Sequence, residues 1–280
     1  MTGSGLPIGV AIGTIGLAAS EWLDAARRLD AAGYRAIWAW DHLVGKGDPT
    51  VPVLEQWTIL AAAAGTTPQA GLGTFVTNVM VRHPAVLARM ASTLQAASGG
   101  RLAIGLAIGG GDRAMAAYGL PNPPVEERVR RLEEAIAVLR ALWSGGPVTR
   151  PSPFYPLVEA HAFPRPEPPP PILVGAQSKR GVDLAARIGD GWAAEEPSFD
   201  ALRSRYLEGL DAAGRRRDDV RVVVGHGGGR TGVDALTGSP WVERPAEAWA
   251  DLQARGADEA IVTARTLRDV AALVEATARW

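Results

Sequence analysis

The sequence contains no cysteine and no excess of charge of either sign. Without cysteine among its 280 residues, disulfides, thiolate nucleophiles, iron–sulfur clusters and cysteine-based zinc sites are excluded. The 29 basic and 30 acidic side chains leave a net charge of −1, which excludes the strongly basic balance typical of proteins that bind nucleic acids. We therefore expect no nucleic-acid partner.

Long apolar runs are missing as well. The uncharged stretch Leu6–Ser20 is too short to cross a membrane and is interrupted by glycines. No basic stretch precedes an apolar segment at the N-terminus, as it would in a signal peptide. Because the absence of cysteine also fits a reducing compartment, we expect a cytoplasmic protein with no membrane partner.

Several catalytic signatures are absent. The sequence has no GxSxG, no HExxH and no cluster of histidines and carboxylates, and its four histidines are spread along the chain. We therefore expect no catalytic metal. With Lys46 and Lys179 as its two lysines, the chain offers few candidates for a Schiff base. The interpretation that remains is a mechanism based on a bound organic cofactor.

What the chain does contain is an alternation of short β-branched runs with longer segments whose apolar residues recur every three or four positions. The predicted strands are Leu6–Ile12, Ala36–Trp40, Gly71–Thr77, Leu102–Ile108, Ile172–Gly175, Gly191–Ala194, Val220–Gly225 and Glu259–Thr263. The predicted helices are Ser20–Ala32 with Ser20 as its N-cap, Leu54–Ala64, Pro84–Ala97, Val125–Trp143, Lys179–Ile188, Phe199–Ala213, Pro245–Ala254 and Leu267–Thr277.

Eight strand–helix units predict a parallel sheet closed into a (β/α)8 TIM barrel, a single domain over residues 1–280. An open doubly wound sheet is the alternative, although no GxGxxG or P-loop follows the first strand. Two irregular insertions interrupt the alternation, and we expect both to contact substrate. Gly145–Pro171 is rich in proline and is interpreted as a stiff surface connection or a linker; Gly225–Pro240 is rich in glycine and is interpreted as a lid or a mobile loop.

In such a barrel, functional side chains gather where the strands end. His42, after the second predicted strand, is the leading candidate because an imidazole exchanges protons near neutral pH; a hydrogen bond to a neighbouring loop is the alternative. His226 shares a strand-end position. His83 is expected to organise the start of the third helix, and His161 to lie on the surface.

Two turns at strand ends could hold a ligand. The glycines Gly109–Gly111 let a flat ligand approach the backbone closely, although ordinary turns use glycine too. Gly175–Ser178, followed by Lys179 and Arg180, combines backbone N–H groups, a hydroxyl and cations, as in a phosphate site at a helix N-terminus. An ordinary N-cap is the alternative.

An ordered set of segments resembles the luciferase-like monooxygenase superfamily, in particular its coenzyme F420-dependent oxidoreductase branch. These segments cover most of residues 6–195, and the likeness is diffuse beyond them. They are Ala36–Leu43 (AIWAWDHL), Leu72–Val76 (LGTFV), Val81–Arg89 (VRHPAVLAR), Ser98–Leu106 (SGGRLAIGL), Gly109–Gly119 (GGGDRAMAAYG), Arg131–Trp143 (RLEEAIAVLRALW), Pro170–Ala176 (PPILVGA) and Gly189–Trp192 (GDGW).

The resemblance implies a luciferase-like barrel, usually a homodimer, with F420 or a flavin lying across the mouth. It implies that His42 and Asp112 are the catalytic residues, with His42 as proton donor or relay. It also implies a cis peptide between Phe75 and Val76, in a bulge that supports the cofactor ring. The cofactor-binding residues that it implies are Asp41, His42, Phe75, Val76, Gly109, Gly110, Asp112, Gly175, Ala176, Gln177 and Ser178.

The first strand differs from that of some relatives, because it ends in Gly13 and Thr14 instead of a carboxylate. This difference from the relatives makes a sugar-phosphate substrate doubtful. We expect an oxidoreductase that transfers a hydride between F420 and an unidentified small organic molecule. The main alternative is an FMN-dependent monooxygenase. An isomerase or aldolase acting on phosphorylated substrates and a non-catalytic cofactor-binding subunit are further alternatives.

Overall fold

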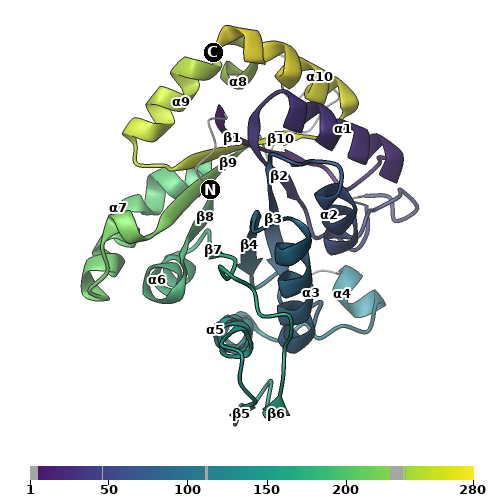
Figure 1. The fold of residues 1–280 in the computed structure, drawn as a ribbon. Coiled ribbons are helices and arrows are strands. Elements are labelled where there is room, and N and C mark those ends of the chain that lie inside the picture. The colour runs from purple at the N-terminus through teal and green to yellow at the C-terminus, as the bar shows by residue number, and fades with distance from the viewer. Residues whose placement is uncertain (1–5, 46, 111–112, 228–235, 237) are drawn as a thin grey trace.

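The computed structural model describes residues 6–45, 47–110, 113–227, 236 and 238–280. Parallel strands close into an eight-stranded barrel in the order β1-β10-β9-β8-β7-β4-β3-β2 (Figure 1). Its closure confirms the predicted (β/α)8 barrel and rules out the open sheet. The barrel strands are β1 Leu6–Ile12, β2 Tyr34–Ala39, β3 Gly71–Asn78, β4 Leu102–Ala107, β7 Ile172–Gly175, β8 Gly191–Glu195, β9 Arg221–His226 and β10 Glu259–Ala264.

Helices follow each strand and cover the outside of the barrel (Figure 1). They are α1 Ala19–Ala31, α2 Gln56–Ala64, α3 Pro84–Ala97, α5 Val125–Trp143, α6 Lys179–Ile188, α7 Glu196–Ala212, α9 Pro245–Ala254 and α10 Leu267–Ala276. Shorter elements not foreseen from the sequence are α4 Arg113–Ala117, α8 Pro240–Glu243 and the 3₁₀ turns η1 Arg217–Asp219 and η2 Thr277–Arg279.

The start of α1 corrects a predicted cap. Ala18, not Ser20, is the N-cap residue. Its backbone N–H donates a hydrogen bond to the carboxylate of Glu21 at 2.8 Å, so the acidic side chain in the first turn satisfies an otherwise unpaired backbone donor. Ser20 therefore lies inside the helix.

Two hydrophobic clusters hold the barrel together. The larger one lies between strands and helices, whereas the smaller one fills the interior and contains Ala11, Ala36, Trp38, Ala103, Leu173, Ala193, Val223 and Ile261. Trp38 fills the centre, and its indole N–H donates to the fully buried carboxylate of Glu259 at 2.9 Å. A Cβ on Gly9 or Gly73 would overlap the indole. The interior is therefore a packed core, and ligands are confined to its ends.

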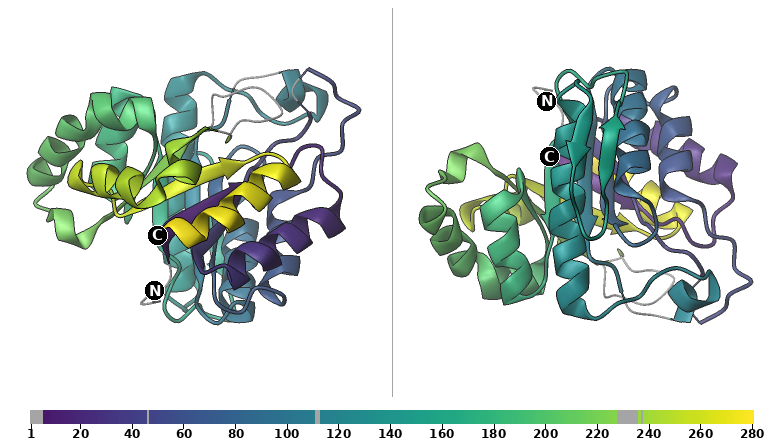
Figure 2. Two further views of the ribbon diagram at one scale, coloured as in Figure 1. Left: turned by 90° about the horizontal axis from the view of Figure 1, so that it is seen from above. Right: turned by 90° about the horizontal axis from the view of Figure 1, so that it is seen from below.

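The strands end at a mouth that carries α4, which lies at one end of the barrel in both views of Figure 2. At this end the pairing of β3 with β4 shifts register between Thr74 and Thr77. The peptide between Phe75 and Val76, inside this irregularity, is cis. Both observations confirm the bulge that the family resemblance implied.

The proline-rich insertion lies outside the barrel. It contains the antiparallel hairpin β5 Val148–Arg150 and β6 Leu157–Ala160, which lies beside α5 (Figure 1 and Figure 2, right). The guanidinium of Arg131 on α5 sits 4.5 Å from the ring centroid of Phe154. None of residues 145–171 lines the cavity at the mouth of the barrel.

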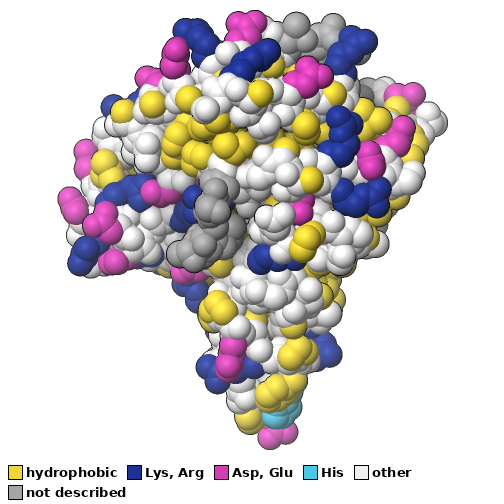
Figure 3. Space-filling view, turned by 45° about the horizontal axis from the view of Figure 1, so that its top comes forward, with side chains coloured by type: hydrophobic (Ala, Val, Ile, Leu, Met, Phe, Trp, Pro, Cys, Tyr) yellow, Lys and Arg dark blue, Asp and Glu magenta, His cyan; other side chains and the backbone are white. Residues whose placement is uncertain are grey.

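The surface shows no concentration of charge of one sign on the face drawn in Figure 3, where basic and acidic side chains are interspersed. In the part of the chain that the structure describes, no helix is both long enough and apolar enough to span a membrane.

The fit between Gly73 and Trp38 leads to a stability prediction. Gly73→Ala places a methyl group where the indole lies, so we expect a loss of about 1–3 kcal/mol in the free energy of unfolding, as for other overpacked cores. Gly65→Ala is the matched control, because a Cβ there has no neighbour within 4 Å and φ is −81°. Urea denaturation measures both, and an equal stability of the two variants would contradict the prediction.

Candidate functional site

A cavity of about 1140 Å³ occupies the mouth of the barrel. The residues that the sequence predicted for the cofactor come from four adjacent strands, β2, β3, β4 and β7, and the loops that follow them. Those that line the cavity are Asp41, His42, Phe75, Val76, Gly109, Gly110, Gly175, Ala176, Gln177 and Ser178. Asp112, the remaining predicted residue, and Gly111 lie outside the described residues. The structure therefore brings together every predicted residue that it describes.

The bulge of β3 supplies the floor of this cavity. The branched side chain of Val76 fits against neighbouring backbone: a Cβ built on Gly175 would lie 3.0 Å from Val76 Cγ1 and 3.1 Å from the Cβ of Ala107. The Phe75 ring stands edge-on to Trp38, with 6.2 Å between the ring centroids. Because the core beneath is solid, the bulge forms a rigid apolar surface.

Asp41 is held firmly at the end of β2. Its carboxylate accepts two hydrogen bonds from the guanidinium of Arg82, at 2.7 and 2.9 Å, and one from the backbone N–H of Asn78 at 2.9 Å. The Asp41 side chain is 3% exposed, and such bidentate charged pairs are among the strongest polar contacts. Arg82 also pairs with Glu55 at the start of α2. This network fixes the end of β2 to the bulge of β3.

His42 lines the cavity next to Asp41. Its ring meets Trp40 edge-on, with 5.8 Å between centroids and an interplanar angle of 85°. Arg265, which follows β10, also lines the cavity, and its guanidinium carbon lies 5.2 Å from the Trp40 ring centroid. The imidazole is therefore half-buried in the wall of the mouth, where a ligand would meet it.

The turn after β7 leads into the N-terminus of α6. The hydroxyl oxygen of Ser178 accepts a hydrogen bond from the backbone N–H of Gly181 at 3.3 Å, so Ser178 is the N-cap. Arg180 also lines the cavity, and Arg113 does so from α4. The turn is therefore an N-cap whose helix N-terminus faces a cavity with cationic side chains, which is an arrangement suited to an anion.

Sequence reasoning assigned no role to several further residues in or near the mouth. Arg128 on α5 is buried and donates a hydrogen bond to the backbone oxygen of Gly109 at 2.6 Å. No local pattern announces such a contact. Glu195, Thr263 and Arg265 also line the cavity. Thr263 and Arg265 lie at the end of β10. The sequence could have predicted them, because functional side chains gather at strand ends in such barrels.

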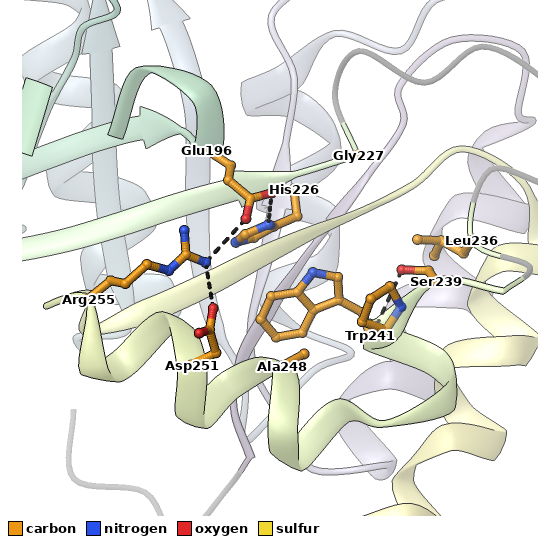
Figure 4. A pocket seen from close by; sticks show the side chains of 10 residues that line it. Glu196, His226, Gly227, Leu236, Ser239, Trp241, Ala248, Asp251 and Arg255 are labelled. Atoms are coloured by element: carbon orange, nitrogen blue, oxygen red, sulfur yellow. Dashed lines mark hydrogen bonds and ion pairs between the residues drawn. The ribbon is translucent and has the colours of Figure 1, made fainter. Parts of the chain in front are cut away.

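His226 lines a second, smaller cavity of about 310 Å³ between β9, α8 and α9 (Figure 4). Alternation explains its position. Val223 belongs to the interior cluster, so Gly225 faces the mouth and His226 faces outward. The imidazole is buried, and its Nδ1 donates to the carboxylate of Glu196 at 2.8 Å. It also packs on Trp241, with 4.6 Å between ring centroids.

The remaining histidines lie where the sequence predicted them. His83 is the N-cap of α3, and its Nδ1 accepts a hydrogen bond from the backbone N–H of Ala85 at 3.2 Å. His161 is exposed. No group of three histidine or acidic side chains suited to a metal occurs in the described part of the chain. The glycine-rich loop is described at Gly227, Leu236 and residues 238–240, and Gly227, Leu236, Ser239 and Pro240 line the smaller cavity.

Fold and site define this chain as a closed (β/α)8 barrel with one large mouth, a bulged third strand and a helix N-terminus facing the cavity. The chain belongs to the luciferase-like monooxygenase family, whose family model matches residues 6–227. The family expected from the sequence is thereby confirmed.

Curated relatives are named as F420-dependent enzymes. The chain is 33% identical over 209 residues, or 71% of its length, to an F420-dependent hydroxymycolic acid dehydrogenase of Mycobacterium tuberculosis. It is 36% identical over 192 residues, or 66% of its length, to an F420-dependent glucose-6-phosphate dehydrogenase of Beutenbergia cavernae. The matches span 58% and 55% of the lengths of these relatives.

Solved structures confirm the fold. An F420-dependent secondary alcohol dehydrogenase, in complex with an F420–acetone adduct, superposes with a TM-score of 0.81 at 18% identity, covering 96% of this chain and 97% of that one. The F420-dependent tetrahydromethanopterin reductase of Methanopyrus kandleri superposes with a TM-score of 0.77 at 18% identity, covering 98% of both chains.

The environment of Glu196 predicts a dependence of stability on pH. The hydrogen bond from His226, aided by Arg255, lowers the pKa of Glu196 from 4.5 to about 2. A carboxyl with a lowered pKa stabilises the fold above its unfolded pKa and loses that contribution as the pH falls toward its folded pKa. Between pH 5.5 and 3, the wild type should therefore lose more unfolding free energy than Glu196→Gln.

We expect this difference to be at most about 1 kcal/mol, because the Glu196 side chain is 42% exposed and solvent screens its charge. Urea denaturation of both proteins at several pH values measures it. Identical pH profiles would show that the ion pair contributes nothing.

Proposed function

We propose that this protein is an oxidoreductase that transfers a hydride between coenzyme F420 and a small organic substrate. The observation that carries the proposal is the meeting of the predicted cofactor residues in one large cavity. Membership of the family and the F420-dependent relatives support it. When bound, the deazaflavin ring of F420 supplies two-electron hydride chemistry.

The cavity fits this cofactor in size and chemistry. Its volume of about 1140 Å³ exceeds the roughly 300–1,000 Å³ of most ligand pockets, so a tricyclic ring and a substrate have room together. We infer that Phe75 and Val76 support the ring and that Gly109 and Gly110 let it approach the backbone. We propose that Asp112, from the same loop, also binds the cofactor.

The anionic tail of the cofactor would occupy the turn after β7. We propose that Gly175, Ala176, Gln177 and Ser178 bind its phosphate, because this turn presents a helix N-terminus to the cavity. The positive charges of Arg180 and Arg113 would favour the same group.

Within this proposal, His42 is the proton donor or relay and Asp112 the second catalytic group. The imidazole of His42 lines the cavity. Asp41 is fully engaged by Arg82 and Asn78, so we assign it the role of positioning its neighbour and the bulge. Of these two residues at the end of β2, we therefore propose that His42 is the one that exchanges a proton.

We further propose that the protein is a single-domain, cytoplasmic homodimer without membrane or nucleic-acid partners. The lack of cysteine and the balanced charge support the location and the absence of nucleic acid, and the family resemblance supports the dimer. The molar mass in solution, compared with 29.4 kDa for one chain, tests the dimer.

Titration with cofactors tests the proposed function. Purified protein is titrated with F420 and, separately, with FMN, and the quenching of cofactor fluorescence is followed. We expect saturable binding of F420 and no binding of FMN. Binding of FMN alone would instead support the alternative, an FMN-dependent monooxygenase. Failure of both would overturn the cofactor assignment.

Replacement of His42 tests the proton role. We expect His42→Ala to bind F420 like the wild type and to lose turnover by about 10²-fold or more, the usual contribution of a general acid or base. His161→Ala is the matched control, because that histidine is exposed on the proline-rich insertion. Reduction of F420 with a substrate found by screening gives the rate. Unchanged turnover would remove His42 from the mechanism.

A further inference from the structure

The mouth has two halves. The cofactor residues come from the arc β2-β3-β4-β7, which leaves the arc β8-β9-β10-β1 of the closed barrel for a substrate. Side chains alternate between the two faces of a strand. Positions of the same parity beyond the interior cluster therefore also face inward, and they form the floor of the mouth. In this layer Glu195 is the ionisable side chain, and the other positions are Gly13, Trp40, Phe75, Ala107, Gly175, Gly225 and Thr263.

The carboxylate of Glu195 lies beside the bulge. A Cβ built on Gly225 would lie 2.7 Å from Phe75 Cζ and 3.3 Å from Glu195 Oε1. The edge of the Phe75 ring and the carboxylate thus meet above the same glycine. Since Phe75 belongs to the proposed support of the cofactor ring, Glu195 lies where a substrate beside that ring would be.

Glu195 is also available for chemistry. Two carboxylates line the cavity in the described part of the chain, Asp41 and Glu195. Asp41 is engaged by Arg82, whereas among the described residues Glu195 makes no side-chain cap hydrogen bond and interacts with His226 and Arg265 through charge alone. Burial raises the pKa of Glu195, while the charges of His226 and Arg265 act against this rise. Its proton therefore exchanges closer to neutral pH than that of an ordinary glutamate.

We propose that Glu195 is an acid–base residue of the reaction, which binds the reacting hydroxyl or carbonyl of an uncharged substrate and exchanges a proton with it. This inference rests on the proposed function. In the oxidation of an alcohol, the C–H bond breaks and its hydride, with both electrons, passes to F420. The O–H proton passes to the Glu195 carboxylate, which leaves His42 the role of relay, and the C–O bond becomes a carbonyl. Reduction is the reverse.

The charge of Glu195 also limits the substrate. The cations Arg113 and Arg180 lie on the cofactor arc, and on the other arc Arg265 lies against the face of Trp40. The charges of Glu195 and Arg265 interact there, so a phosphate dianion would meet a carboxylate as well as a guanidinium. We therefore infer a substrate without a phosphate group, unlike the substrate in the name of the Beutenbergia cavernae relative.

The test uses F420-loaded protein and compares Glu195→Gln with Glu196→Gln. The control removes the same charge one residue away, where the side chain lines the smaller cavity (Figure 4). Probes are a panel of uncharged alcohols and ketones and glucose 6-phosphate, and the change in F420 fluorescence gives the rate. Fluorescence quenching gives the affinity for F420 and shows that each variant folds.

We expect the wild type to turn over an uncharged probe, and Glu195→Gln to lower kcat by about 10²-fold without changing F420 affinity. In the wild type, alcohol oxidation should rise with pH through the raised pKa of Glu195, and Glu195→Gln should lose this acidic limb. Glu196→Gln should retain both rate and limb. Glucose 6-phosphate should inhibit Glu195→Gln more strongly than wild type.

Other results would overturn the proposal in distinguishable ways. Absence of F420 binding would refute the proposed function itself. F420 binding with turnover of glucose 6-phosphate alone, or with no turnover of any uncharged probe, would refute the role of Glu195 but leave the cofactor assignment standing. The same holds if Glu195→Gln keeps the wild-type rate and pH profile.

Discussion

The closure of the barrel around Trp38 is the constraint on which the site depends. The indole fills the interior and bonds to Glu259, and Gly9 and Gly73 lack the side chains that would displace it. A solid interior leaves the mouth as the place where a large ligand can lie. It also gives the β3 bulge a rigid base, so the floor of the cavity, where the cofactor is proposed to lie, is rigid because of the packing one layer below.

The alternation of side chains along each strand then decides which functional groups share a cavity. Glu195 and Glu196 are neighbours in sequence, yet one lines the mouth and the other binds His226 in the smaller cavity. Gly225 and His226 are divided in the same way. A residue must therefore lie at a strand end to reach the site, and it must also be at an odd or even position that points its side chain into the barrel.

The sequence predicts the barrel well because its signal is local. Apolar runs bounded by turn residues define β1 and β7, and the 3.6-residue periodicity with Pro84 and Trp143 at its limits defines α3 and α5, with the bounds observed. Short elements such as α4 and the β5–β6 hairpin lack such periodicity. The contacts of Arg82 with Asp41 and of Arg128 with Gly109 join residues 41 and 19 positions apart, and no local pattern announces them.

The candidate site was predictable on one arc and not on the other, for a physical reason. The arc proposed for the cofactor is formed by segments before residue 195, where the likeness to a known family is dense, as expected if the family shares a cofactor. The family model ends at residue 227, whereas Thr263 and Arg265 complete the other arc. That arc is the one proposed to face the substrate, so its chemistry must be derived from side-chain direction and charge. Glu195 lies on the boundary between the two arcs, which is why the proposal places it between the cofactor and the substrate.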